Sequence, residues 1–76
     1  MAPRVRDLDW QVDVTDGEET RFSDTVLGRY CAWVRKGVAY VIIPGATSPE
    51  SSGATIEDAL RHAQSDFERK ILSALA

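Results

Sequence analysis

The sequence predicts an α+β fold, in which three to four antiparallel β-strands form a sheet that a single C-terminal helix covers on one face (ββββα). In the first half of the chain, apolar and polar residues alternate with a period of two, which is typical of strands. From position 55 onward, apolar residues recur at three- and four-residue steps, which is typical of a helix. The dipeptides Asp16-Gly17 and Lys36-Gly37 are tight-turn signals. With 76 residues, we expect a single domain over 1–76.

Four segments are predicted to be strands, at about 8–14, 19–25, 29–35 and 38–43. The first has the clearest pattern, because its apolar residues occupy every second position: Leu8, Trp10, Val12 and Val14. The last is apolar on both faces, which normally means that both faces are covered.

Residues 44–54 are small, polar and turn-forming, and we expect a mobile loop there. A helix is predicted over about 55–75. Thr55 is a favourable N-cap, and Asp58 stands where the acid of a capping box would stand. Phe67 lies in the middle of the apolar stripe, so we expect it to be fully buried against the sheet.

Charge and hydropathy exclude some classes of function. The net charge is −3 and the sequence pI is near 4.9, which argues against nucleic acid as a partner because such binders are usually basic. The longest apolar run, 38–43, is far shorter than the roughly 20 residues of a membrane-spanning helix. The N-terminus lacks a signal-peptide pattern, so we expect a cytoplasmic protein without membrane contact.

No catalytic, metal-binding or cofactor-binding motif is found, and we expect no enzymatic activity and no cofactor. Cys31 is the only cysteine. A small buried hydrophobe is the better interpretation of it than a catalytic thiol. His62 on the predicted helix is interpreted as a surface residue rather than as a metal ligand or base.

One helix can cover only one sheet face, and we assign to the covered face Trp10, Val12, Val14, Phe22, Tyr30, Ala32 and Val34. Cys31, Trp33 and half of strand 38–43 then remain on the opposite face. Either the N-terminal arm or the long loop shields them, or the facing is inverted, or a partner covers them.

We assign a partner-binding role to Arg29, Trp33, Arg35 and Val41, because Trp and Arg are enriched at the centres of protein interfaces. The partner would be another protein or a second copy of the chain. The same aromatic and basic groups could instead stack on single-stranded bases.

The chain resembles a family of small uncharacterised proteins encoded in prophage regions of α-proteobacteria. The resemblance covers most of residues 8–75 and is carried by a set of strand and helix residues: Trp10, Gly28, Tyr30, Glu57, Asp58, Ala59, Ala63, Gln64, Asp66, Phe67, Glu68 and Ile71. It implies a sheet-plus-helix fold and a phage protein that binds host machinery, a class that includes anti-CRISPR inhibitors acting by occlusion.

Residues 53–60 also look like the helix start of the antitoxin family called HicB. This short similarity implies the alternative function, an antitoxin-like or DNA-contacting module with Arg29, Trp33 and Arg35 on nucleic acid. A small enzyme subunit is the third hypothesis.

Overall fold

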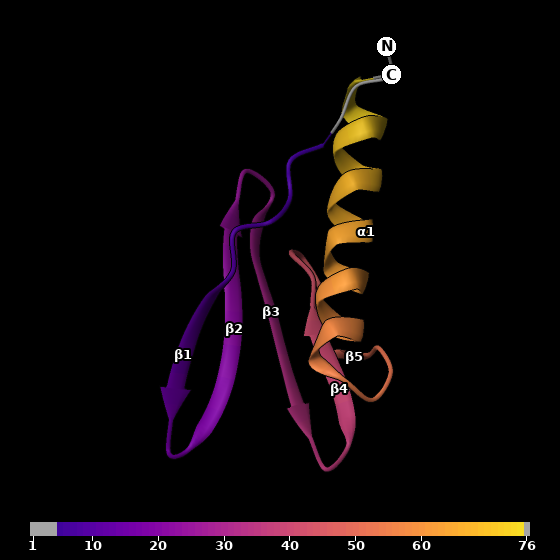
Figure 1. Ribbon diagram of the computed structural model, residues 1–76. Helices are drawn as coiled ribbons and strands as arrows, with labels where there is room; N and C mark the ends of the chain where they lie inside the picture. Colours follow the sequence, from indigo (N-terminus) through magenta and orange to yellow (C-terminus); the bar gives the residue numbers. More distant parts are fainter. Residues whose placement is uncertain (1–4, 76) are drawn as a thin grey trace.

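The structure is a computed structural model that describes residues 5–75. Within this range, five strands form one antiparallel sheet in the order β1-β2-β3-β4-β5, and α1 lies against one face (Figure 1). The elements are β1 (Gln11–Thr15), β2 (Glu18–Thr25), β3 (Gly28–Arg35), β4 (Val38–Ile42), β5 (Glu50–Ser51) and α1 (Ile56–Leu75). The predicted α+β fold with a single C-terminal helix is confirmed, with one more strand than expected.

The additional strand, β5, lies inside the predicted loop 44–54. Glu50 and Ser51 pair with β4. Just after β5, the Ser52 N–H donates to the Ala39 carbonyl at 2.8 Å, and the Ala39 N–H donates to the Gly53 carbonyl at 2.8 Å. The end of the loop is therefore attached to the edge of the sheet.

Two of the hairpins turn at the predicted dipeptides. Asp16 and Gly17 both have positive φ angles, 53° and 78°, and Lys36 and Gly37 have φ angles of 51° and 75°. Positive φ at both central positions defines a type I′ turn, whose twist matches that of the flanking strands. Glycine adopts this conformation without steric cost, which explains its place in both turns.

The predicted first strand, 8–14, is shorter in the structure, where pairing begins at Gln11. The residues before it lie beside α1 instead. The Leu8 N–H donates to Gln64 Oε1 at 2.8 Å, and Gln64 Nε2 donates to the Arg6 carbonyl at 3.2 Å. The side-chain amide of Gln64 thus takes the part that a neighbouring strand would play.

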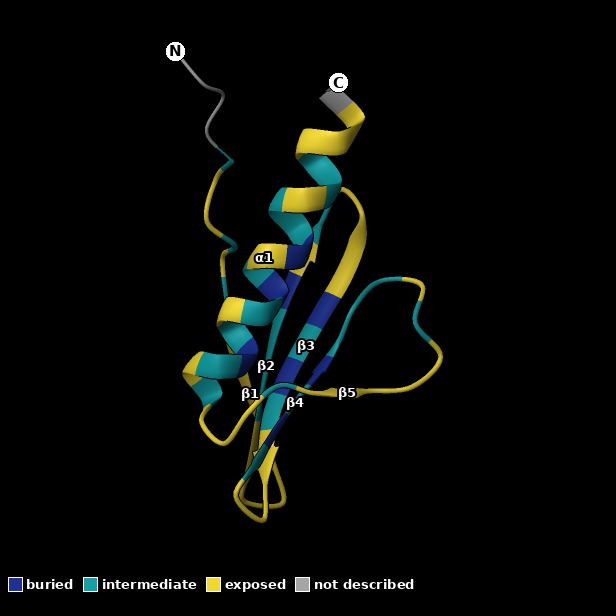
Figure 2. Cartoon of the chain, turned by 90° about the vertical axis from the view of Figure 1, so that its right-hand side faces the viewer, coloured by how far each residue is buried: buried dark blue, intermediate teal, exposed yellow. Residues whose placement is uncertain are grey.

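The core lies between α1 and the two strands that the helix contacts, β3 and β4 (Figure 2). Its fully buried residues are mostly small: Tyr30, Ala32, Ala39, Val41, Ala59 and Ala63. Alanine side chains on both surfaces allow the helix backbone to approach the sheet closely. The core is consequently thin, and partly buried residues such as Leu60 and Phe67 surround it.

The assignment of Phe22 to the helix side is wrong. Phe22 lies directly opposite Cys31, and residues directly opposite each other point to the same face. Both therefore point away from α1. Val12 and Val14 do lie on the helix side, but their exposed fractions are 54% and 60% because the helix does not reach β1.

Two further expectations concern α1. The capping box is confirmed, because the Asp58 N–H donates to Thr55 Oγ1 at 3.3 Å and the Thr55 N–H donates to Asp58 Oδ2 at 3.2 Å. The backbone hydrogen bond from Thr55 is the main cause of a lowered pKa of Asp58. Phe67 is only partly buried, since it lies at the margin of the core with its ring at 89° to that of Tyr30.

A buried hydrogen-bonded group joins α1 to β3. Tyr30 Oη donates to Asp66 Oδ2 at 2.8 Å. Arg69 Nη2 lies 2.6 Å from Asp66 Oδ1 and Lys70 Nζ lies 2.9 Å from Asp66 Oδ2, while the Asp66 side chain is only 3% exposed. Burial raises the pKa of Asp66, but hydrogen bonds from Lys70 and Tyr30 and the two positive charges outweigh it, so that the pKa is lowered overall.

We predict that Asp66→Asn lowers the free energy of unfolding at pH 7 by about 1–3 kcal/mol, because the buried Tyr30 hydroxyl loses its charged acceptor and two cations lose their partner. The folded-state pKa lies below the ordinary value of 3.8. The carboxylate therefore stabilises the fold above about pH 4, and this contribution is lost as the pH falls through the folded-state pKa. Urea unfolding should show that the difference in free energy of unfolding between wild type and Asp66→Asn becomes smaller as the pH is lowered from 7 to 2.5.

The matched control is Asp9→Asn, at an exposed position. Its unfolding curve should stay close to that of the wild type at each pH. An Asp66→Asn protein as stable as the wild type at pH 7 would contradict this account of how the helix is held.

Candidate interaction surface on the outer sheet face

The sheet face opposite α1 carries a continuous group of large side chains. Cross-strand pairing places Phe22, Cys31 and Ile42 in one row, and Trp33 and Tyr40 in the next. We call these five residues the outer apolar patch. Each is partly buried by its neighbours, and no described helix or strand lies over them.

The centre of the outer apolar patch is a stacked aromatic pair. The rings of Trp33 and Tyr40 lie with their centroids 5.7 Å apart and their planes 24° apart. A shallow hollow of about 290 Å³ beside Trp33 is lined in part by Cys31 and Ile42. Stacking holds the indole in a defined orientation, so the patch offers a rigid aromatic surface.

Both predicted arginines lie on this face, and each is paired with an acid. Arg29 Nε lies 2.7 Å from Asp24 Oδ1, and its guanidinium lies 4.6 Å from the centre of the Phe22 ring. Arg35 Nη2 lies 3.1 Å from Glu18 Oε2. The hydrogen bond from Arg29 lowers the pKa of Asp24. These pairs give the outer apolar patch a polar rim with balanced charge.

The structure thus brings together Arg29, Trp33 and Arg35, whereas the assignment of Val41 to the partner surface is wrong. Val41 lies opposite Ala32, points at α1 and is fully buried. In β4 the odd-numbered Ala39 and Val41 face the helix, so it is the even-numbered positions that face outward.

Sequence reasoning missed three members of the outer apolar patch: Phe22, Tyr40 and Ile42. The signal that identifies Phe22 is the register of the β2–β3 hairpin, in which Thr25 is paired with Gly28 across the two-residue turn. Counting outward from that pair places Phe22 opposite Cys31.

The Cys31 thiol is a packing group of this surface. Burial is the main cause of a raised pKa of Cys31, with the charge of Arg29 acting against it. A raised pKa keeps the thiol protonated at neutral pH, and the protonated thiol is a poor nucleophile and metal ligand.

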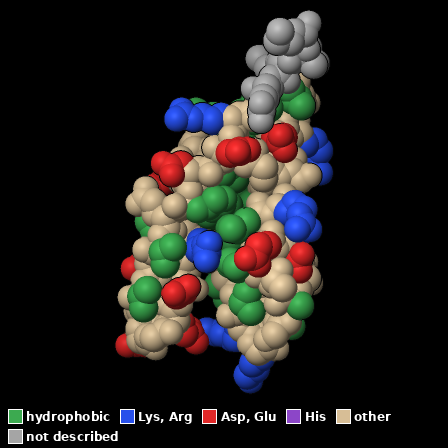
Figure 3. Space-filling view, in the orientation of Figure 1, with side chains coloured by type: hydrophobic (Ala, Val, Ile, Leu, Met, Phe, Trp, Pro, Cys, Tyr) green, Lys and Arg blue, Asp and Glu red, His purple; other side chains and the backbone are tan. Residues whose placement is uncertain are grey.

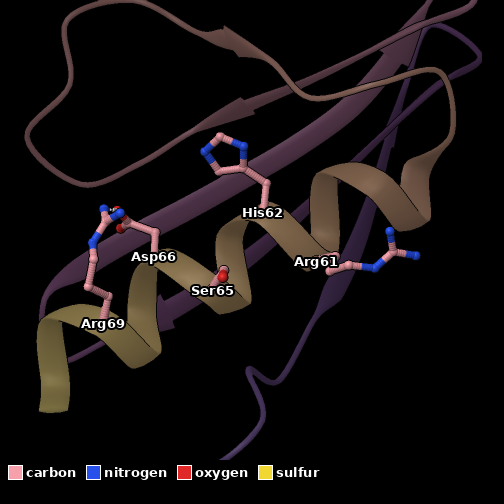
Figure 4. Close-up of a pocket in the computed structure, with 5 residues that line it drawn as sticks. All are labelled: Arg61, His62, Ser65, Asp66 and Arg69. Atoms are coloured by element: carbon pink, nitrogen blue, oxygen red, sulfur yellow. Dashed lines mark hydrogen bonds and ion pairs between the residues drawn. The ribbon is translucent and has the colours of Figure 1, made fainter.

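A second hollow, of about 360 Å³, lies along α1 and is lined by Arg61, His62, Ser65, Asp66 and Arg69 (Figure 4). Its charged groups already have partners. Asp66 binds Arg69, Lys70 and Tyr30, and Arg61 Nη1 lies 3.5 Å from Asp58. The charged side chains that line this hollow therefore belong to the network that holds the helix.

His62 connects α1 to the end of the loop. Its Nδ1 lies 2.9 Å from Ser52 Oγ, and its Nε2 lies 3.1 Å from Glu50 Oε2. A serine, a histidine and a carboxylate in this order occur in hydrolases. Acyl transfer also needs N–H donors for the developing oxyanion, and the N–H of Ser52 is already bound to Ala39. The geometry fits a clasp that fixes β5 to the helix.

In the part of the chain that the structure describes, no three His, Cys, Asp or Glu residues form a group that could hold a metal ion. Within residues 5–75, no helix has both the length and the apolar character needed to cross a membrane. No family model, curated protein or solved structure matches the chain.

We predict that His62→Ala loosens β5 without unfolding the sheet, because Glu50 and Ser52 lose their common partner on α1. Amide exchange of the Ser52 N–H should become at least several-fold faster, while that of β2 and β3 stays slow. Arg61→Ala, an exposed neighbour on the same helix, is the control. Equal exchange at Ser52 in the wild type and in His62→Ala would show that the clasp contributes nothing.

Proposed function

We propose that the chain is a non-enzymatic protein-binding module that docks through the outer apolar patch. The observation that carries the proposal is the stacked pair of Trp33 and Tyr40 at the centre of a sheet face that no other described element covers. Tryptophan, tyrosine and arginine are the residues that dominate interface energetics.

The layout of the face supports this function. Apolar side chains occupy its middle, and the pairs Arg29–Asp24 and Arg35–Glu18 stand around them. An apolar centre with a polar rim is the usual anatomy of a protein interface. Balanced charge at the rim also suits a second copy of the chain, whose own arginines would meet these acids.

The prophage resemblance adds a target to this proposal, namely a host complex that the module inhibits by occlusion, as anti-CRISPR proteins do. The net charge of −3 is compatible with such a target, because an acidic surface is attracted to a basic nucleic-acid channel.

We predict that Trp33→Glu abolishes association and preserves the fold. A charge placed in a dry contact is costly. At the free surface the variant loses only the stacking with Tyr40, worth about 1 kcal/mol, and the partial burial of the indole. The measurements are light scattering for self-association and affinity capture from the host with wild type and variant side by side, with circular dichroism to monitor folding.

Val41→Glu is the matched control, because it places the same charge on the buried side of the neighbouring strand and should unfold the protein. If Trp33→Glu neither changes the molar mass in solution nor removes any captured protein, the outer apolar patch is not the binding surface.

The shared face of Arg29, Trp33 and Arg35 also favours one second candidate, a DNA-contacting or HicB-like module. Both arginines are engaged by acids, which weakens this candidate, since binding would have to break those pairs or extend beyond them. Phosphate contacts make nucleic-acid affinity fall steeply with salt.

We predict no specific binding of duplex or single-stranded DNA at 50 mM salt, measured by fluorescence anisotropy. The control is Asp24→Asn, which releases Arg29 from its partner. Tight wild-type binding that declines steeply between 50 and 200 mM salt would establish the second candidate in place of the first.

A further inference from the structure

The edge of the sheet at β1 is open in the described part of the chain. β1 pairs only with β2, and all five of its residues are exposed. An exposed edge presents unpaired backbone donors and acceptors, which a further strand can bind. At the opposite edge, β5 has only two residues and is held by the His62 clasp.

The hairpin geometry determines which backbone groups are available. In a two-residue hairpin the residues that flank the turn, here Thr15 and Glu18, exchange hydrogen bonds, and bonded positions then alternate along the strand. Asp13 and Thr15 therefore direct their backbone groups toward β2. Those of Val12 and Val14 point outward at the free edge.

The side chains of the same edge differ between the two faces. On the helix side, Val12 and Val14 border the space that α1 leaves uncovered, where Val34 is also 41% exposed. Figure 3 shows hydrophobic side chains gathered between the β1–β2 hairpin and the helix, with charged groups among them. A strand added to β1 would place every second side chain beside Val12 and Val14.

The edge also carries negative charge, and strand alternation directs the Asp13 side chain to the outer face. Asp13 lies in the middle of β1, with Asp9 before the strand and Asp16 in the turn. None of these three acids takes part in an ion pair with another described residue. A basic side chain on an added strand would lie directly opposite Asp13.

We propose that the free edge of β1 binds an extended segment of a partner protein in which apolar residues alternate with lysine or arginine. The outward backbone groups of Val12 and Val14 supply the ladder, their side chains meet the apolar residues, and Asp13 meets the basic residue between them. This mode of recognition is β-strand addition. It uses a different surface from the outer apolar patch and does not depend on it.

A second copy of the chain fits this edge less well. The antiparallel register that pairs all five residues of β1 with themselves would place Asp13 opposite the same residue of the other copy. Like charges directly opposite each other are destabilising. A basic partner removes this repulsion and replaces it with attraction.

The test is a titration, followed by amide chemical shifts, of the full chain with the blocked peptide Lys-Val-Arg-Val-Lys. Shifts should concentrate at residues 11–15. The scrambled peptide Val-Val-Lys-Lys-Arg should bind at least tenfold more weakly. Asp13→Lys should lower the affinity for the basic peptide at least tenfold and create affinity for the acidic peptide Glu-Val-Glu-Val-Glu.

Val14→Pro tests the backbone ladder itself. Proline removes an N–H that points away from β2, so the hairpin should survive and peptide binding should be lost. Trp33→Glu should bind the peptide as the wild type does, which separates this site from the outer apolar patch. Equal affinity for the scrambled peptide, full binding by Val14→Pro, or self-association that shifts residues 11–15 without peptide would overturn the proposal.

Discussion

The contact between α1 and strands β3 and β4 determines which surfaces of the molecule are left open. Small residues on both sides, Ala32 and Ala39 on the sheet and Ala59 and Ala63 on the helix, let the backbones approach closely. The bond from Tyr30 Oη to Asp66 fixes the helix along its axis, since a shift of one turn would leave a buried hydroxyl and a buried carboxylate without each other. The helix therefore has one position on the sheet.

That position leaves much of the sheet uncovered. Five strands spaced about 4.8 Å apart span about 20 Å, whereas a helix with its side chains is about 10 Å wide. The N-terminal segment, which is hydrogen-bonded to Gln64, covers a further part of the sheet near Leu8. Among residues 5–75, no helix or strand covers the outer face or the part of the β1–β2 hairpin near its turn. The position of α1 thus leaves two surfaces of different chemistry open. One is an aromatic face whose arginines are paired with acids, and the other is an acidic strand edge beside exposed valines.

Local patterns were sufficient to predict most of the fold. Each of these features depends on a short segment of sequence, and each is confirmed: both tight turns, the capping box of Thr55 and Asp58, and the apolar stripe of the helix. Facing within each strand was harder. Tyr30 and Ala32 were placed correctly, but Phe22 was assigned to the helix side without the register of β2 and β3, which pairs it with Cys31. The assignment of Val41 to the partner surface was wrong for a related reason. A strand that is apolar on both faces has no alternation that shows which residues point to which face.

β5 could not be predicted from the sequence. Two residues show no periodicity, and they pair with Tyr40 and Val41 across a long loop. The same is true of the His62 clasp, whose members Glu50 and Ser52 look like ordinary loop residues until the strand brings them to the helix. For the candidate site, sequence reasoning predicted the grouping of Arg29, Trp33 and Arg35. It did not predict that Asp24 and Glu18 would engage both arginines, since ion pairs between strands depend on register.

The acids along β1 disfavour pairing of this open edge with the same edge of a second copy. Charged residues on an edge strand are a common protection against unwanted pairing, and Asp13 stands at the centre of the strand, where a copy of itself would be repelled most strongly. The protection is selective because it acts through charge alone. Within the described residues, no proline, bulge or loop blocks the backbone groups of Val12 and Val14, so a strand that neutralises Asp13 can extend the sheet there. The residue that discourages self-pairing at this edge is therefore also the residue that selects a basic partner.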